Sequence, residues 1–208
     1  MSQIALPLEP RAGGGARRIV VGSANAAAIE AFAGAAAWPF RTAILFGPPR
    51  SGKSLLAEYF AASGLGEVLD DADRLEEVAV FHRWNRAQHD QRPLLLTASV
   101  RGAVAGGWQV ALPDLASRLA AALRLEIGAP DDAMAEELIA AHAAARGLAI
   151  GSEGARYLAL RAERSHVGLE RLVATIDRLS LERKTAPGLA IWRDALDALS
   201  GRGQPRLL

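Results

Sequence analysis

The chain has 208 residues, of which 50% are hydrophobic and 23% are charged, a balance that supports a folded core and excludes a wholly disordered protein. It contains no cysteine, which excludes disulfide frameworks, zinc–thiolate sites and cysteine nucleophiles. The net charge of +1 argues against a protein that coats nucleic-acid backbones. No apolar run reaches the roughly 18 to 20 residues that a membrane span needs. The N-terminus has no basic stretch ahead of an apolar one, which a secretory signal would have. We therefore expect a cytoplasmic protein.

Residues 1–18 are expected to form a flexible tail. A short apolar hexapeptide is followed by a proline and a run of three glycines, which is typical of an extended, mobile arm. Ordered structure should begin near Ile19. The segment 23–37 then predicts a helix, with Ser23 or Asn25 as its N-cap.

The middle of the chain alternates between strand patterns and helical patterns. Residues 42–46 form a short apolar run that stops at Gly47, as a buried parallel strand does. Strands that alternate with helices predict an α/β fold with a parallel sheet between helices. We expect about four strands, at 42–46, 67–70, 93–97 and 123–127, with helices at 53–63, 72–88 and 113–122.

The character of the sequence changes after Pro130. Helical patterns follow one another without a strand signal, and Gly147 and Gly151 are expected to end helices. We therefore predict an α/β domain over 19–129 and an all-helical domain over 130–208. The helices of the second domain are expected at 131–146, 152–163, 165–184 and 189–199.

One motif carries specific chemistry. The segment from Gly47 to Ser54 reads GPPRSGKS and matches the P-loop pattern G-x-x-x-x-G-K-[ST] in full. Glycines let successive backbone N–H groups point at phosphates, and the positive N-terminus of the following helix adds to that field. Lys53 is expected to reach the β- and γ-phosphates, and Ser54 to offer its hydroxyl to Mg²⁺. Because a strand pattern precedes the motif and a helical pattern starts at Lys53, the sequence favours a nucleotide site over a glycine-rich turn without a ligand.

Two carboxylates follow the second predicted strand, and a P-loop protein needs an acid there for its metal ion. The segment Val68-Leu69-Asp70-Asp71 has this Walker B arrangement. Asp70 would orient Mg²⁺ through water, and Asp71 would polarise the attacking water as general base. The alternative is that Asp70, Asp71 and Asp73 cap the following helix. The upstream P-loop favours the Walker B interpretation.

Arg118 ends the segment Leu115-Ala-Ser-Arg118, just before the last predicted strand. A side chain in this place can face a neighbouring subunit. The residues alone do not distinguish it from a solvated helix arginine, and both interpretations stay open here.

Together these segments resemble the DnaA-related branch of the AAA+ ATPases, over residues 19 to about 199. Ile19-Val-Val-Gly22 resembles the stretch that wraps the adenine in that family, and Leu69-Asp70-Asp71 and Leu95-Leu-Thr97 follow in family order. Asp114-Leu-Ala-Ser-Arg118 resembles the box whose arginine enters a neighbour's ATP site. Gly128-Ala-Pro130 and Leu172–Leu179 resemble parts of the lid.

The resemblance implies a P-loop AAA+ core followed by a helical lid, with ADP or ATP and Mg²⁺ as ligands. It implies that Arg118 is an arginine finger acting in trans, that Asp71 is catalytic, and that Ser54 and Asp70 hold the metal ion. The implied nucleotide-binding residues are Val20, Val21, Gly47, Ser51, Gly52, Lys53, Ser54, Leu55 and Arg171.

The N-terminal hexapeptide resembles a second functional element. Its sequence QIALPL is similar to the Q-L-[SP]-L-P-L peptide that binds the bacterial sliding clamp, the β subunit of DNA polymerase III. In this family, the layout of such a peptide before an AAA+ module implies a negative regulator of chromosomal replication initiation. The clamp-bound regulator stimulates the replication initiator DnaA to hydrolyse its ATP. The alternative is a disordered apolar tail. The clamp-binding residues would be Gln3, Ile4, Leu6, Pro7 and Leu8.

Three features depart from the family pattern. Only 15 residues separate Ser54 from Asp70, which leaves no room for the usual extra strand and its helices or for the initiator's DNA-engaging insertion. Ser99 stands where an acid is common at the sensor I position. Glu170, with Arg171 beside it, stands at the sensor II arginine. We therefore expect weak or no intrinsic ATPase activity, with ADP as the usual ligand.

Other functions stay open. A self-sufficient AAA+ ATPase of the helicase-loader type would turn over ATP alone, and a nucleotide-independent adaptor would keep the P-loop as a relic. Direct DNA binding is expected to be slight because the charge is near neutral. No membrane partner is expected, and a homodimer remains an alternative to a monomer.

Overall fold

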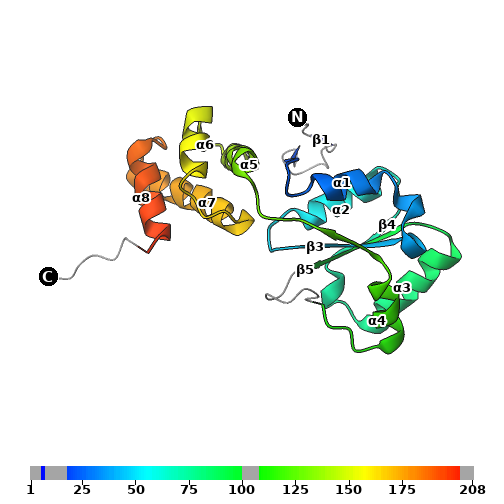
Figure 1. Cartoon of the computed structure of the whole chain (residues 1–208). Coiled ribbons are helices and arrows are strands. Elements are labelled where there is room, and N and C mark those ends of the chain that lie inside the picture. The colour runs from blue at the N-terminus through cyan, green and yellow to red at the C-terminus, as the bar shows by residue number, and fades with distance from the viewer. Residues whose placement is uncertain (1–5, 8–17, 100–107, 202–208) are drawn as a thin grey trace. The chain divides into compact units, whose positions relative to one another are not determined.

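The computed structural model describes residues 6–7, 18–99 and 108–201. Within these ranges the chain divides into two compact units, and the division falls between Gly128 and Ala129. Figure 1 shows the sheet in one unit and the helix bundle in the other. The α/β unit holds residues 23–128, and the helical unit holds residues 129–201 together with 18–22.

The α/β unit contains a four-stranded parallel sheet in the order β4-β5-β3-β6, which confirms the predicted fold class. Every residue of β3 and β5 is buried, because the two central strands have neighbours on both edges and helices on both faces. The strands are β3 (Thr42–Gly47), β4 (Glu67–Leu69), β5 (Leu94–Ser99) and β6 (Leu123–Glu126).

Helices cover this sheet, with α1 and α2 on one face and α3 and α4 on the other (Figure 1). Their bounds are α1 (Ala26–Phe32), α2 (Lys53–Ala62), α3 (Glu77–His89) and α4 (Pro113–Ala120). On the α3–α4 side the core is made by Ile44, Phe46, Val80, Leu94, Leu96 and Leu115. On the α1–α2 side, the indole of Trp38 stacks on Phe60, with ring centroids 5.4 Å apart.

Two of the predicted helices contain a 3₁₀ turn and are shorter as α-helices than the sequence predicts, and the helix predicted over 152–163 ends at Ala159. The segment predicted as one helix over 23–37 is α1 followed by a short 3₁₀ turn at Ala35–Ala37. The segment predicted over 72–88 starts as a 3₁₀ turn, Ala72–Arg74, and α3 begins only at Glu77. The break lies at Leu75, whose backbone is extended at φ −86° and ψ 158°.

The strand register brings the ends of three strands to one edge of the sheet. Gly47, the last residue of β3, lies opposite Ser99, the last residue of β5. Leu69, the last residue of β4, lies opposite Leu96, so Asp70 follows at the level of Thr97. The carboxyl ends of parallel strands are where ligands bind in open α/β sheets, and this edge therefore positions the candidate site.

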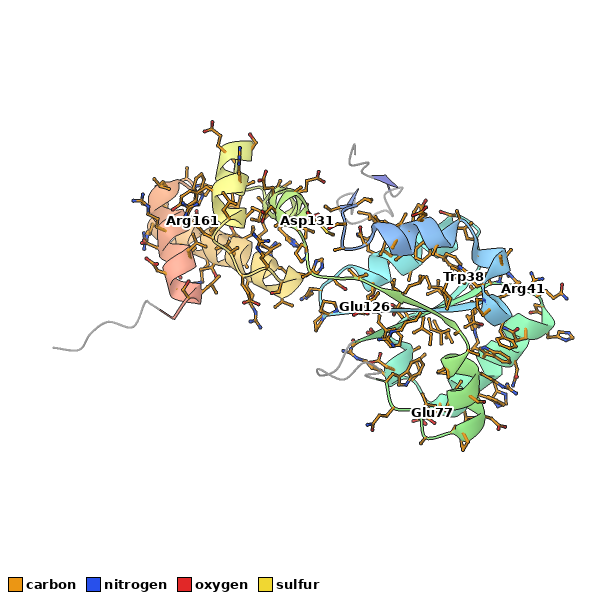
Figure 2. All side chains as sticks on the ribbon, viewed as in Figure 1. Trp38, Arg41, Glu77, Glu126, Asp131 and Arg161 are labelled. Atoms are coloured by element: carbon orange, nitrogen blue, oxygen red, sulfur yellow. The ribbon has the colours of Figure 1, made fainter. Side chains whose placement is uncertain are left out.

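The helical unit is built from α5 (Asp132–Ala145), α6 (Ser152–Ala159), α7 (His166–Arg183) and α8 (Leu189–Leu199). Asp131, labelled in Figure 2, accepts a hydrogen bond from the backbone N–H of Met134 at 2.8 Å and so caps α5. Gly147, at φ +68°, follows α5 in the left-handed conformation that favours glycine. The bundle core includes Ile139, Leu158, Leu169, Leu172, Ile176 and Ile191. No helix in the described ranges is both long and apolar enough to cross a membrane.

Within the predicted tail the structure describes only residues 6–7 and 18. Leu6–Pro7 form the short strand β1, which pairs with β2 (Arg18–Ile19) in a separate two-stranded sheet. Of the clamp-binding residues predicted from the sequence, Gln3, Ile4 and Leu8 lie outside the described residues.

Candidate nucleotide-binding site

The loop between β3 and α2 has the backbone that its motif predicts. Arg50 and Gly52 adopt positive φ angles of 64° and 88°, and such a conformation is unstrained only for glycine. Gly52 is the N-cap of α2, which starts at Lys53. The orphan N–H groups of the first helical turn therefore lie directly after the loop, where they attract anions.

Gly47 is closely surrounded by side chains of its own loop and by Ile127. A Cβ atom at this position would lie 2.7 Å from Ser51 Oγ and 3.2 Å from the Cβ of Ile127. A side chain at Gly47 would therefore require the Ser51 hydroxyl to turn away and Ile127 to shift.

Lys53 is buried, with 6% of its surface exposed. Its Nζ donates to the carbonyl oxygens of Gly47 at 3.0 Å and Pro48 at 3.1 Å. Burial lowers the pKa of Lys53, and the nearby carboxylates of Asp71, Asp73 and Asp70 offset part of that shift. The ammonium thus lies inside the loop in a partly desolvated setting, where attraction to a phosphate would be stronger than in water.

A second polar group in the loop points to an anionic ligand. Ser51 is buried, and its hydroxyl oxygen has no hydrogen-bond partner among the described residues. Buried polar groups are nearly always paired in proteins, so an unpaired hydroxyl in the same loop as a buried ammonium, just ahead of a helix N-terminus, fits a phosphate. The described side chains suit the phosphate groups of a nucleotide.

Asp70 and Asp71 meet a buried threonine at the end of β4. The Thr97 hydroxyl donates to Asp70 Oδ1 at 2.6 Å, and the backbone N–H of Asp71 donates to Thr97 Oγ1 at 2.8 Å. Asp71 takes the left-handed conformation at φ 48° and ψ 42°, and its carboxylate pairs with Arg74 at 3.3 Å. Asp71 occupies the N-cap position of the following 3₁₀ turn, and Asp73 lies in the first turn. Neither this turn nor α3 has a side-chain N-cap hydrogen bond, so the acids do not cap by hydrogen bonding, and their Walker B role remains a prediction.

A magnesium ion would not have a complete protein cage here. No group of three or more His, Cys, Asp or Glu side chains within the described ranges could hold a metal ion. Mg²⁺ commonly takes one or two protein ligands and completes its shell with phosphate oxygens and water. Ser54, the second residue of α2, and Asp70 are both exposed, and they fit that limited role.

Arg118 is held by α3. Its guanidinium carbon lies 4.4 Å from the ring centroid of Phe81 and 4.5 Å from that of Trp84. Its Nη1 donates to Asn85 Oδ1. These contacts show that Arg118 is more than a solvated helix arginine; whether it serves a partner's nucleotide stays a prediction.

The other predicted residues are divided between the two units. Leu55 lies in α2, in the α/β unit, whereas Val20, Val21 and Arg171 belong to the helical unit. Gly22, the residue after Val21, packs on Met134, since a Cβ there would lie 2.9 Å from Met134 Cβ. Their assignment to nucleotide binding remains a prediction.

Sequence reasoning missed the partner of Asp70 and the partners of Arg118. Thr97 is recognisable only as the polar end of the apolar run Leu94-Leu-Leu-Thr97, and nothing in that pattern names Asp70 as its partner. The stacking residues of Arg118 lie 34 and 37 positions earlier in the chain, and a spacing of that size carries no periodic signal.

Known proteins share this fold at low sequence identity. The RuvB Holliday junction branch migration motor of Thermotoga maritima is 20% identical, with a TM-score of 0.60 over 86% of this chain and 70% of that one. Domain III of the replication initiation protein DnaA from Thermotoga maritima is 16% identical, with a TM-score of 0.65 over 86% of this chain and 94% of that one. A replication initiator DnaA bound to AMPPCP and single-stranded DNA is 17% identical, with a TM-score of 0.56 over 80% of this chain and 66% of that one. No protein-family model and no curated protein matches the sequence. The similarity shows that this chain shares the fold of these proteins.

Proposed function

We propose that the chain is a nucleotide-binding regulator of replication initiation, of the type that Hda represents. In this proposal it is recruited by the sliding clamp and stimulates ATP hydrolysis by the initiator DnaA. The observation that carries nucleotide binding is that one loop contains both the buried Lys53 ammonium and the buried Ser51 hydroxyl, which has no hydrogen-bond partner among the described residues. The regulatory role rests on the clamp-like hexapeptide and on Arg118.

The phosphate groups of ADP or ATP would enter the loop between β3 and α2. Lys53 would exchange its two loop carbonyls for phosphate oxygens, which are better partners because they carry charge. The Ser51 hydroxyl and the first N–H groups of α2 would supply further donors. Mg²⁺ would neutralise phosphate charge at Ser54 and Asp70.

Recruitment would use the N-terminal peptide as an extended segment. Gln3, Ile4, Leu6, Pro7 and Leu8 would enter the peptide pocket of the clamp. Because Leu6–Pro7 pair with Arg18–Ile19 in the free chain, the clamp would have to replace this short strand pairing.

Arg118 would act on the nucleotide of the initiator. An arginine supplied in trans stabilises charge on the transferring phosphoryl group and raises hydrolysis by about 10³- to 10⁵-fold. Arg118 would first have to leave Phe81, Trp84 and Asn85, which hold it in the free chain. A bidentate contact with phosphate oxygens would offset that loss.

The test is ATP hydrolysis by the initiator, measured with this protein and DNA-loaded clamp together and with each omitted. We expect stimulation only when both are present. The Lys53→Ala variant should bind no ADP in calorimetry and should fail to stimulate. Equal hydrolysis with and without the protein would refute the regulatory role, whereas tight ADP binding by Lys53→Ala would refute the phosphate site.

A self-sufficient ATPase is the second candidate, and the ordered contacts of Asp70 and Asp71 with Thr97 favour it. The isolated protein would then hydrolyse ATP at a measurable rate, and Asp71→Asn would abolish this turnover. Ser99 and Glu170 at the sensor positions favour the regulator over this candidate.

A further inference from the structure

Thr97 is completely buried in β5, yet its hydroxyl has two polar partners at the carboxyl edge of the sheet. It donates to Asp70 Oδ1 at 2.6 Å and accepts the backbone N–H of Asp71 at 2.8 Å. One side chain from the neighbouring strand therefore contacts both consecutive acids.

The two hydrogen bonds fix the direction of the hydroxyl hydrogen. A threonine hydroxyl has a single donor and two acceptor lone pairs. Since the Asp71 N–H occupies the acceptor side, the one hydrogen is directed at Asp70. The distance of 2.6 Å lies in the range of a hydroxyl bound to an ionised carboxylate, which is a strong hydrogen bond.

This contact leaves Asp70 anchored at one oxygen and accessible at the other. Asp70 is exposed, and within the described ranges no other side chain donates to it. The threonine thus limits rotation of the carboxylate while leaving its second oxygen open to a ligand at the sheet edge. Partners of this kind orient metal ligands in many proteins.

We infer that Thr97 is a positioning residue, which holds the Asp70 carboxylate in the orientation that Mg²⁺ requires when it accompanies a bound nucleotide. The inference rests on the proposed nucleotide binding and adds a residue to that site. A merely structural hydroxyl would affect stability and leave the response to Mg²⁺ unchanged.

The experiment measures the affinity of the full chain for AMPPCP by calorimetry, with Mg²⁺ and with EDTA. Thr97→Val removes the hydroxyl and keeps the branched shape, and Thr97→Ser keeps the hydroxyl. The matched control is Thr42→Val, because Thr42 is equally buried in the same sheet but donates to the carbonyl oxygen of Phe40 at 2.9 Å. Should Thr97→Val fold poorly, Thr97→Ala provides the same comparison.

We expect Mg²⁺ to tighten AMPPCP binding by the wild type. The magnesium factor is the ratio of the affinity with Mg²⁺ to the affinity with EDTA. Thr97→Val should reduce the magnesium factor about 10-fold or more, the usual range for such partners. Thr97→Ser should restore it, Thr42→Val should leave it unchanged, and affinity in EDTA should stay within about twofold in all variants. An unchanged magnesium factor in Thr97→Val, or an equal loss in Thr42→Val, would overturn this inference alone. Failure of the wild type to bind any nucleotide would overturn the proposed function as well.

Discussion

Lys53 and Arg118 are the two cations on which the proposed chemistry depends, and the protein holds both by contacts that a ligand would have to replace. Lys53 donates to two carbonyls of its own loop, and Arg118 lies between two aromatic rings and an amide. All of these contacts are noncovalent. In the free chain, both cations therefore make internal hydrogen bonds or stacking contacts, which ligand binding would have to replace.

The buried lysine makes stability depend on pH. Burial holds the folded-state pKa of Lys53 below its ordinary value of 10.5. Between the folded-state pKa and 10.5, the unfolded chain binds more protons than the folded chain, so the free energy of unfolding rises with pH. Lys53→Met lacks this contribution. We expect the difference in unfolding free energy between wild type and Lys53→Met to shift in favour of the wild type as pH rises towards 10.5.

Urea unfolding at a series of pH values measures this difference. Lys184→Met, which removes an exposed lysine, is the matched control for loss of a lysine. A difference that stays constant or changes in the opposite direction would show that the Lys53 ammonium is not desolvated in the folded protein.

Arg118→Ala is expected to remove stimulation of the initiator's ATPase and also to lower stability by about 1–3 kcal/mol, since it deletes two cation–π contacts and a hydrogen bond. Arg118→Lys should restore little stimulation, because an ammonium cannot form the planar bidentate contact. The readouts are initiator ATP hydrolysis and the melting temperature.

Arg124→Ala is the control for this prediction. Arg124 lies in β6, with its guanidinium 4.1 Å from the ring centroid of Phe46, so its removal deletes a similar stacking contact on a neighbouring element. Arg124→Ala should retain most stimulation. Wild-type stimulation by a folded Arg118→Ala variant would rule out the arginine finger.

At the scale of elements, the site is made by a turn and two strand ends. The loop after β3 curls tightly at Gly47, and Asp70 after β4 is anchored to β5 through Thr97. On the face of the sheet that α3 and α4 cover, the carboxylate of Glu77 in α3 is labelled in Figure 2. It accepts hydrogen bonds from the backbone N–H groups of Ala111 at 2.8 Å and Leu112 at 2.7 Å, just ahead of α4. Hydrogen bonds between elements thus fix the loops at their ends.

Gly47→Ala should distort the P-loop. The added methyl would lie 2.7 Å from Ser51 Oγ, so we expect a loss of about 1–3 kcal/mol in stability, as for other overpacked positions, together with weaker ADP binding. Thermal unfolding and calorimetry provide the two measurements.

Gly34→Ala provides the comparison, because its added Cβ would have no neighbour closer than the Ala31 carbonyl oxygen at 3.7 Å. This variant should bind ADP like the wild type and stay within about 0.5 kcal/mol in stability. If Gly47→Ala bound ADP equally well, the tight curl would not be required for phosphate binding.

At the scale of the whole molecule, the proposed regulator combines an α/β unit, a helical unit and a recruiting peptide. The α/β unit has its own hydrophobic core around the sheet, and the helical unit has a separate core between α5 and α8. Because the sequence assigns residues 3–8 to a tail ahead of the α/β domain, we expect recruitment to be separable from folding.

Replacing Gln3, Leu6 and Leu8 by alanine should abolish co-elution with the clamp while the circular dichroism spectrum and ADP affinity stay unchanged. Micromolar binding amounts to only about 8 kcal/mol in total, so loss of several anchors makes the complex undetectable. Glu9→Ala with Arg11→Ala alters the same segment outside the hexapeptide and should co-elute normally. Persistent co-elution of the triple variant would place the clamp contact elsewhere or exclude it.

The sequence by itself determined the order of the elements, the four-stranded parallel sheet and the P-loop. These features depend on local patterns: an apolar run before Gly47, a glycine at position 52 where φ is positive, and a helical pattern from Lys53. The extent of the helices was less predictable. The break at Leu75, between the 3₁₀ turn and α3, depends on how the chain leaves the sheet edge after Asp71.

Only the tertiary structure decided which groups meet across the sheet and between the helices. Thr97 reaches Asp70 because β5 lies between β4 and β3, and strand order is not written in any local pattern. Arg118 stacks on Phe81 and Trp84 because α4 packs beside α3. The burial that lowers the pKa of Lys53 likewise arises from the folded loop. Local spacing specifies elements and turns, whereas long-range packing sets the partners, the desolvation and the orientation of the side chains that they carry.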